Sequence, residues 1–178
     1  MTKLWRISAV NPNYREWEKM TPNIQLQDAR NQHLRVFSMS RTENIKTFWM
    51  YSNLKNIIEY ENHEPAEWNT YLYHGCSRRN VDSIVADGLN RSHCQSRGKL
   101  GCAIYLSTSL DLAVKHATKY TPGGECSVLA CKALRGQYTV GKPGLLQPPM
   151  KNEKTHARFD ATVHRMNNPQ KMAFYLDR

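Results

Sequence analysis

Residues 71–75 read Tyr-Leu-Tyr-His-Gly, and residues 101–107 read Gly-Cys-Ala-Ile-Tyr-Leu-Ser. Both are short apolar runs with β-branched or aromatic character, which predicts two β-strands. His74 and Gly75 stand at the end of the first strand, where glycine lets a flat ligand approach the backbone N–H and C=O groups. Tyr105 lies within the second strand and offers a ring face. If the two strands are neighbours, these residues form a slot for a planar ring that bears an amide.

The bulk composition is that of one globular domain. The chain has 178 residues, of which 40% are hydrophobic and 22% charged, enough to form a real core. It contains no run of apolar residues long enough to span a bilayer, and its first six residues lack the apolar core of a secretory signal. We therefore expect a cytoplasmic or nuclear protein that is not secreted and has no membrane partner.

Cysteine usage and charge limit the other classes of partner. The five cysteines are odd in number and form no C-x-x-C pair, so we expect reduced thiols and no metal site. The net charge of +10 attracts phosphates, nucleic acid and acidic protein surfaces. The basic residues are scattered, which is more typical of a solvated surface, so nucleic-acid binding stays an alternative. The sequence indicates no oligomeric state.

Helix and strand patterns follow one another irregularly. Because regular β-α-β units are few, the fold class is mixed α+β and not a doubly wound sheet. Thr42, Asn80 and Ser109 are expected helix caps, and Gly88 is an expected helix stop. The sequence predicts further strands at residues 31–40, 126–134, 136–141, 158–163 and 171–176, helices at residues 43–58, 81–86 and 110–119, and loops at residues 59–69, 89–100 and 142–156.

Helical spacing also predicts which faces point inward. Residues 1–30 show weak periodicity, with one short helix expected at residues 13–19. We expect them to form an extension that packs on a domain spanning residues 31–178. The expected inward faces are Ile45, Phe48, Trp49, Tyr51 and Leu54 in the first long helix, and Leu112, Ala113, His116, Ala117 and Tyr120 in the last.

Six motifs, in order, resemble those of the PARP superfamily, the ADP-ribosyltransferases of diphtheria-toxin type. Residues 71–76 resemble its Leu-Phe-His-Gly-Thr signature, residues 88–92 its Gly-Phe-Asn-Arg-Ser stretch, and residues 101–106 its tyrosine strand. Three later stretches, at residues 120–138, 144–160 and 168–169, are similar to the core strands and to the C-terminal half of the mono-ADP-ribosylating branch. The resemblance implies an ADP-ribosyltransferase fold, with split antiparallel β-sheets and flanking helices around an NAD cleft.

The resemblance also implies roles for individual residues toward NAD, the substrate. His74 would hydrogen-bond a ribose 2′-hydroxyl, the Gly75 backbone would pair with the nicotinamide carboxamide, and Tyr105 would stack on the nicotinamide ring. The other implied NAD contacts are Ser107, Ala113 and His116 around the nicotinamide pocket, with His116 at the place of a second stacking tyrosine, and Asn90 and Arg91 near the adenosine end.

One implied catalytic position departs from the family pattern. After Asn168-Pro169, chain-elongating members have a glutamate, and mono-transferring members have Ile, Leu or Tyr. Here the position falls on Lys171, or on Met172 if the register slips by one residue. Since neither is glutamate, we expect no polymer formation.

Two functions of different classes follow. The first is an NAD-dependent mono-ADP-ribosyltransferase, which transfers ADP-ribose to an acceptor protein, to itself or to a nucleic acid and releases nicotinamide. The alternative is a catalytically weak or inactive module that binds NAD, ADP-ribose, nucleic acid or a protein partner. The departure at Lys171 motivates the alternative. Measurements of NAD binding and of salt-dependent RNA binding distinguish the two functions.

Overall fold

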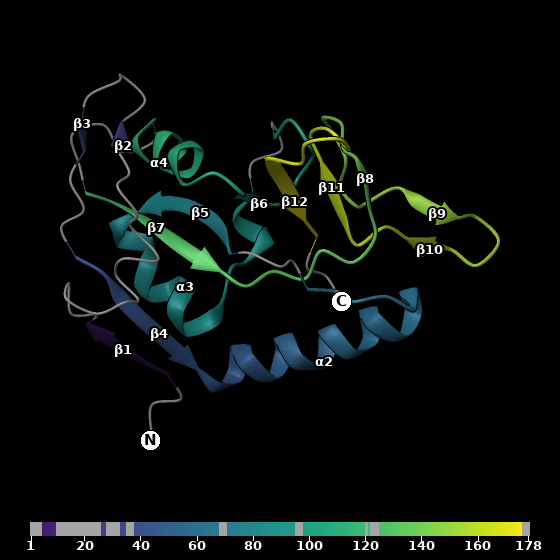
Figure 1. Cartoon of the computed structure of the whole chain (residues 1–178), viewed down its shortest axis with the longest axis horizontal. Helices are drawn as coiled ribbons and strands as arrows, with labels where there is room; N and C mark the ends of the chain where they lie inside the picture. Colours follow the sequence, from purple (N-terminus) through teal and green to yellow (C-terminus); the bar gives the residue numbers. More distant parts are fainter. Residues whose placement is uncertain are drawn as a thin grey trace.

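A six-stranded β-sheet with the strand order β7-β5-β6-β12-β11-β8 organises the protein (Figure 1). The computed structural model describes residues 5–9, 26–27, 33–34, 38–67, 71–94, 98–119, 121 and 125–175. Neighbouring strands of the sheet are antiparallel except β11 and β8, which are parallel. Three two-stranded sheets and three α-helices complete the described fold, which is the predicted α+β class.

The bounds of the elements agree with most of the predicted segments from residue 70 onward. The main sheet contains β5 (Leu72–Ser77), β6 (Ile104–Ser107), β7 (Cys126–Cys131), β8 (Tyr138–Val140), β11 (Ala161–Val163) and β12 (Lys171–Phe174). The two-stranded sheets pair β1 (Trp5–Ala9) with β4 (Ser40–Asn44), β2 (Leu26–Gln27) with β3 (His33–Leu34), and β9 (Met150–Asn152) with β10 (Ala157–Arg158). The helices are α2 (Ile45–Asn62), α3 (Val81–Asp87) and α4 (Leu110–Lys119), with 3-10 turns η1 (Arg78–Asn80) and η2 (Arg91–His93).

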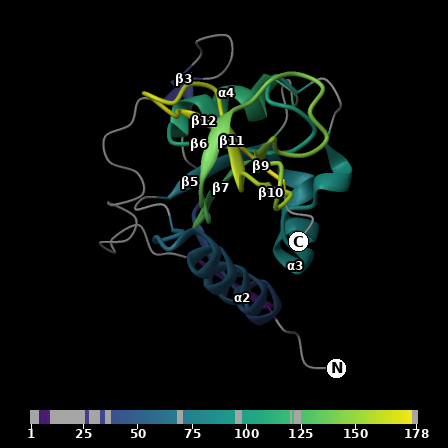
Figure 2. The ribbon, with the colours of Figure 1, turned by 90° about the vertical axis from the view of Figure 1, so that its right-hand side faces the viewer.

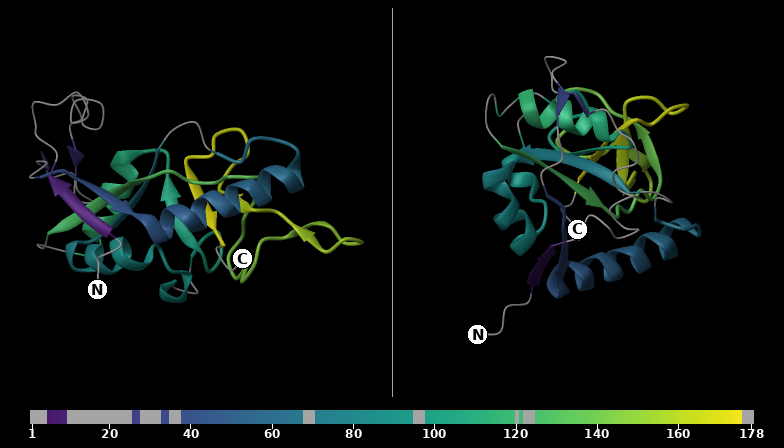
Figure 3. Two further views of the ribbon diagram at one scale, coloured as in Figure 1. Left: turned by 90° about the horizontal axis from the view of Figure 1, so that it is seen from below. Right: turned by 60° about the vertical axis from the view of Figure 1, so that its left-hand side comes forward.

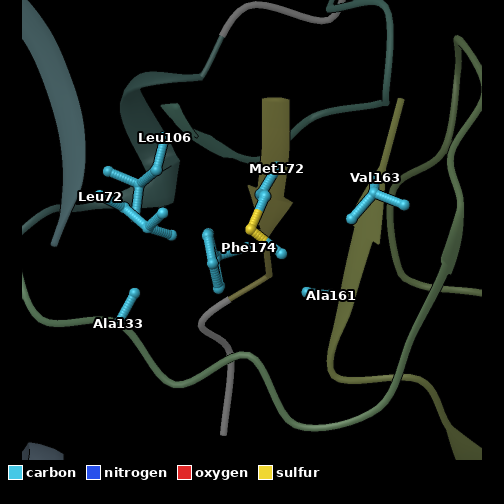
Figure 4. Packing of buried hydrophobic residues seen from close by; sticks show 7 residues of the cluster. All are labelled: Leu72, Leu106, Ala133, Ala161, Val163, Met172 and Phe174. Atoms are coloured by element: carbon cyan, nitrogen blue, oxygen red, sulfur yellow. The ribbon is translucent and has the colours of Figure 1, made fainter. Parts of the chain in front are cut away.

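Strand β12 lies in the middle of the sheet and is buried on both faces. Successive side chains of a strand point to opposite faces, so Met172 and Phe174 enter one core cluster and Ala173 enters another. Figure 4 shows the first cluster, in which β12 packs against residues of β5, β6 and β11. Its members are Leu72, Leu106, Ala133, Ala161, Val163, Met172 and Phe174. Since Met172 is completely buried, the register of β12 is fixed by the core.

Helices α3 and α4 lie on opposite sides of β5 and β7 (Figures 1 and 2). Helix α4 buries Ala113, Val114 and Ala117, and the Ser109 hydroxyl accepts a hydrogen bond from the Leu112 N–H at 3.3 Å, which confirms the predicted cap. Helix α3 ends at Gly88, whose φ of 85° is a left-handed value that glycine adopts readily. Within the described residues, no helix has the combined length and apolarity needed to cross a membrane.

The prediction for α2 is wrong in its cap and in part of its inward face, whereas the inward positions of Tyr51 and Leu54 are confirmed. Asn44, not Thr42, caps the helix, because its side chain accepts from the Thr47 N–H at 3.2 Å. The Asn44 side-chain amide also donates to α3, to the carbonyls of Val85 and Ala86. Helix α2 packs through Ile58, Tyr51 and Leu54, while Ile45, Phe48 and Trp49 are more than half exposed. The apolar residues of α2 occupy two faces, and the face that packs inward lies against Ala66 and Leu134.

Four smaller predictions also need correction. Asn80 makes no capping bond through its side chain. His116 is exposed, although its spacing placed it on the inward face of α4. The expected loop at residues 142–156 contains β9, which forms a hairpin with β10 that projects from the body of the protein (Figures 1 and 3). The strand expected at residues 158–163 is interrupted, since β10 ends at Arg158 and β11 begins at Ala161.

Cys94 and Cys102 form a disulfide, so the prediction of reduced thiols is wrong for this pair. Their Cα atoms are 5.5 Å apart, within the usual range for a disulfide. Turn η2 and the turn at residues 99–100 bring the two cysteines together, which their spacing in sequence does not reveal. The helix expected at residues 13–19, residues 31–32 and 35–37 of the strand expected at residues 31–40, and Tyr120 lie outside the described residues. The boundary at residue 30 stays a prediction.

Candidate active site

The two strands that carry the predicted site are neighbours, and they part where the site residues lie. The paired residues of β5 and β6 are Tyr73 and Ser107. If the antiparallel register continued, Gly75 would face Tyr105, but the pairing ends before that point. We call this place, where β5 and β6 part at Gly75 and Tyr105, the strand junction.

His74 bridges the strand junction through one ring nitrogen. Its Nδ1 lies 2.9 Å from the Tyr105 carbonyl oxygen. Since a carbonyl only accepts, Nδ1 carries the hydrogen, and in the neutral ring Nε2 presents a lone pair to a donor such as a hydroxyl. Burial lowers the pKa of His74, and the hydrogen bond to Tyr105 offsets part of this shift. The site therefore favours the neutral ring, fixed in one tautomer.

The backbone of Gly75 points away from β7 and toward the strand junction. The Arg78 N–H donates to the Glu125 carbonyl at 3.1 Å, next to the β5–β7 ladder in which Gly75 pairs with Val128. Backbone groups alternate between the two sides of an antiparallel strand. Gly75 lies three residues before Arg78, so its N–H and C=O point to the opposite side, toward β6. These are the groups that the sequence predicts to bind a carboxamide.

Helix α4 packs directly on Gly75. A Cβ at this position would collide with the backbone carbonyl of Ala113 and lie 3.1 Å from the Ala117 Cβ, so no larger residue fits without a shift of the helix. Partial burial lowers the pKa of His116, and a hydrogen bond with the Gly75 backbone offsets part of this shift. The helix thus brings Ala113 and His116 to Gly75.

Tyr105 is held by its hydroxyl group. The hydroxyl accepts from the Leu100 N–H and donates to the Gly101 carbonyl, each at 2.8 Å. Burial raises the pKa of Tyr105, and the hydrogen bond from Leu100 partly opposes this. Gly98 is needed beside the ring, because a Cβ there would meet the Tyr105 hydroxyl. The ring is therefore fixed at both ends, by the strand and by the turn.

The third predicted catalytic position lies beside Ser107. Lys171 pairs with Ser107 across β12 and β6, and its side chain is exposed. Met172 faces the opposite side and is completely buried in the core. Of the two residues that the sequence left open, Lys171 is the one on the side of Tyr105 and Ser107. The Ser107 hydroxyl donates to the Gln170 carbonyl at 2.8 Å, which anchors the start of β12.

The loop residues predicted at the adenosine end make structural contacts of their own. Asn90 caps η2, since its side chain accepts from the Ser92 N–H at 2.8 Å. The Arg91 guanidinium donates to the backbone carbonyls of Cys102 and Leu146. These contacts tie the loop to the chain that precedes β6 and to the segment that follows β8. The adenosine contacts of both residues stay predictions.

Sequence reasoning missed two residues that support the site. The Tyr175 hydroxyl donates to the Leu100 carbonyl, in the same turn that holds Tyr105. The Leu145 carbonyl accepts from the Cys102 N–H at 2.7 Å. Neither has a local sequence signal, because both contacts join segments more than forty residues apart in the chain.

The charged groups around the strand junction are mainly cationic. After burial and the Gly75 bond, electrostatic interactions with His74, Lys119 and Lys171 each lower the pKa of His116. The ranges of α4, β5, β6 and β12 contain a single carboxylate, Asp111, which pairs with Lys115 at 2.9 Å. Among the described residues, no group of His, Cys, Asp or Glu could hold a metal ion.

Comparison with known proteins points to one family. A family model described as the poly(ADP-ribose) polymerase catalytic domain matches residues 13–171. The protein mono-ADP-ribosyltransferase PARP10 of Mus musculus is 27% identical over 180 residues, a match that covers 98% of this chain. The chain matches only 18% of the length of that relative.

Proposed function

The chain belongs to the poly(ADP-ribose) polymerase catalytic domain family, and on that premise we propose that it is a member of the mono-ADP-ribosylating branch and transfers one ADP-ribose from NAD to a protein acceptor. The observation that supports this most is the His74–Tyr105 bridge at 2.9 Å. The bond joins His74, whose Nε2 is the free hydrogen-bond acceptor next to Gly75, to the strand that carries the Tyr105 ring.

In the proposed reaction, the bond between C1′ of the ribose and the nicotinamide nitrogen breaks. The electron pair leaves with nicotinamide, positive charge develops on the ribose, and an acceptor oxygen attacks C1′. The Nε2 of His74 accepts from a ribose hydroxyl, the Gly75 N–H donates to the carboxamide oxygen, and Tyr105 stacks on the ring. These groups orient the substrate. They do not deprotonate the acceptor, so an acidic side chain, already ionised at pH 7, is the acceptor that needs no base.

The start of β12 supports transfer of a single unit. Chain elongation in the family uses a glutamate at this position, to activate the hydroxyl of the growing chain. Lys171 offers an ammonium group instead, which accepts no proton while it is charged. The proposed product is therefore an acceptor that bears one ADP-ribose.

Incubation with NAD labelled in its adenylate phosphate tests the proposal. We expect labelled protein that releases AMP on phosphodiesterase digestion, without the phosphoribosyl-AMP that internal units of a chain would give. Gly75→Trp should abolish labelling, and Lys154→Trp, on the exposed β9–β10 hairpin, serves as the control. Because Gly75→Trp collides with Ala113, a thermal melt must show that it folds, and His74→Ala provides a second variant. Labelling that persists in both site variants would refute the mechanism.

Lys171 also favours a second candidate, a module that binds the dinucleotide without turnover. Its ammonium lies close enough to influence His116, and a positive charge there opposes the positive charge that develops on the ribose. Calorimetry with a non-hydrolysable NAD analogue distinguishes the candidates. Analogue binding without label transfer supports a binding module. No analogue binding, together with salt-dependent RNA binding, would contradict both roles for the NAD site.

A further inference from the structure

The disulfide between Cys94 and Cys102 closes a short loop beside the candidate site. The two cysteines are eight residues apart in the sequence. The loop contains the turn at residues 98–101, in which the Gly101 N–H donates to the Gly98 carbonyl at 3.1 Å. Cys102 lies three residues before Tyr105, so the disulfide ties the loop to the chain that enters β6.

The same turn holds the hydroxyl group of Tyr105. The hydroxyl accepts from the Leu100 N–H and donates to the Gly101 carbonyl, each at 2.8 Å. The fit is close, because a Cβ at Gly98 would collide with the hydroxyl. Both partners of the hydroxyl therefore lie inside the loop that the disulfide closes. Without this closure the loop has more conformations to lose before the turn can form.

The surroundings of the five cysteines select this pair for thiol chemistry. Cys94 and Cys102 are half-buried, so a small molecule has access to them. The Cys94 N–H donates to the Arg91 carbonyl at 2.8 Å, and the Arg91 guanidinium donates to the Cys102 carbonyl at 3.5 Å. A cation beside the pair favours the thiolate, which is the form that attacks a disulfide. Burial has the opposite effect on the remaining thiols, since it raises the pKa of Cys76, Cys126 and Cys131.

We propose that Cys94 and Cys102 are a redox-sensitive pair, whose disulfide orders the turn that holds Tyr105 and strengthens NAD binding, and whose reduction weakens it. This regulation rests on the proposed function, since it requires the nicotinamide ring to lie against Tyr105. The sequence predicts a cytoplasmic or nuclear protein, and disulfides in those compartments are usually transient, catalytic or redox-sensing.

The oxidising co-reactant is a small-molecule disulfide of the glutathione class. One protein thiolate attacks a sulfur of this disulfide, whose S–S bond breaks and releases one small-molecule thiolate. The second protein thiolate then attacks the protein sulfur of the mixed disulfide, and the second small-molecule thiolate leaves. The protein loses two electrons to the co-reactant, and the two protons of its thiols end on the two released thiols. A reduced dithiol reverses the exchange.

Equilibration of the chain in glutathione redox buffers tests the pair without NAD. Alkylation under denaturing conditions and peptide mass spectrometry should show the thiols of Cys94 and Cys102 lost together as the buffer becomes oxidising, while the other three stay alkylated. Hydrogen exchange of the Leu100 N–H, measured by NMR, reports on the turn. We expect this exchange to be about tenfold faster in the reduced chain. A disulfide between another pair of cysteines, or equal exchange in the two states, would overturn the inference.

Calorimetry with a non-hydrolysable NAD analogue tests the link to the site. A disulfide that closes a loop of this length changes the population of the closed form by roughly a hundredfold at most. Since the bonds to Tyr105 hold part of the turn without it, we expect the dissociation constant to be about tenfold higher after reduction. Equal dissociation constants in the two states would overturn the inference and leave the proposed function in place. Binding in neither state would overturn both.

Serine variants separate the disulfide from other effects of the redox buffer. Cys94→Ser and Cys102→Ser should both bind the analogue about tenfold more weakly than the oxidised wild type, whatever the buffer. Cys126→Ser is the matched control, because Cys126 is also half-buried but lies outside the pair, and it should keep the wild-type response. Thermal melts establish that each variant folds. Serine variants of the pair that bind as tightly as the oxidised wild type would contradict the role of the disulfide.

Tyr105→Phe tests whether the hydroxyl carries the coupling. This variant keeps the ring and the disulfide but loses both hydrogen bonds to the turn. Its oxidised and reduced states should therefore bind the analogue with equal affinity, although the disulfide still forms. A tenfold response that persists in Tyr105→Phe would contradict the proposed route through the turn.

Discussion

Replacing Tyr105 with phenylalanine keeps the ring and removes the two hydrogen bonds of the hydroxyl. One of them comes from the N–H of Leu100, a residue that is 3% exposed, and the other goes to the Gly101 carbonyl. A buried N–H that loses its partner costs about 1–3 kcal/mol. We therefore expect Tyr105→Phe to lower the free energy of unfolding by about 2 kcal/mol, because the turn at residues 98–101 loses its anchor.

Urea denaturation measures this change. With a slope of roughly 1–3 kcal/mol per molar urea, the midpoint should fall by about 1 M while the slope stays constant. Tyr60→Phe is the matched control, since Tyr60 is 81% exposed and should leave the midpoint unchanged. A midpoint for Tyr105→Phe equal to that of the control would refute the hydroxyl as an anchor. A changed slope would instead indicate that the variant alters the folded or unfolded ensemble.

Three other perturbations test different parts of the structure. Met172→Ala creates a cavity in the fully buried core and should cost about 2–5 kcal/mol in urea denaturation. Asn44→Ala removes the cap of α2 and its bonds to the Val85 and Ala86 carbonyls, so we expect a loss of about 1–3 kcal/mol, measured by thermal unfolding. Burial lowers the pKa of His74 in the folded state, so the unfolded chain binds its proton at higher pH than the folded chain. Stability should therefore decrease as the pH falls through about 6.5. His74→Gln should reduce that slope in midpoints measured between pH 8 and pH 5, and an unchanged slope would contradict the burial argument.

The central strands of the fold were predictable because local patterns decided them. The runs that became β5, β6 and β7 are apolar and bounded by turn residues, and Ser109 and Gly88 act as helix signals through contacts with near neighbours. In α2, by contrast, apolar residues occupy two faces. The inward face packs against Leu134, and the cap residue Asn44 bonds to α3, in each case more than forty residues away in the chain. No window of local sequence contains those contacts.

The residues of the candidate site also fall into two groups, those that local sequence predicts and those whose contacts depend on packing between elements. His74, Gly75 and Tyr105 were identified from their strands, and their meeting point follows once the strands are neighbours. The bond from His116 to Gly75 and the support from Tyr175 depend on packing between elements. His116 shows the difference most clearly. Its helical spacing predicted an inward residue, whereas the residue is exposed and one ring nitrogen turns back to the backbone of β5.

The core decides which of the two residues left open for the third predicted catalytic position lies on the side of Ser107. Lys171 and Met172 are adjacent in β12, so their side chains point to opposite faces of the sheet. A slip of one residue would bring Met172 to the side of Ser107 and drive the Lys171 ammonium into the cluster around Phe174 and Val163. The slip would lose the burial of Met172, worth about 2–5 kcal/mol by the cost of truncating such a residue. It would also bury a charge with no carboxylate in that cluster to pair with it. Because both effects oppose the slip, Lys171 stays on the side of Tyr105 and Ser107, and a substitution at this position changes the charge on that side without a shift in the register of β12.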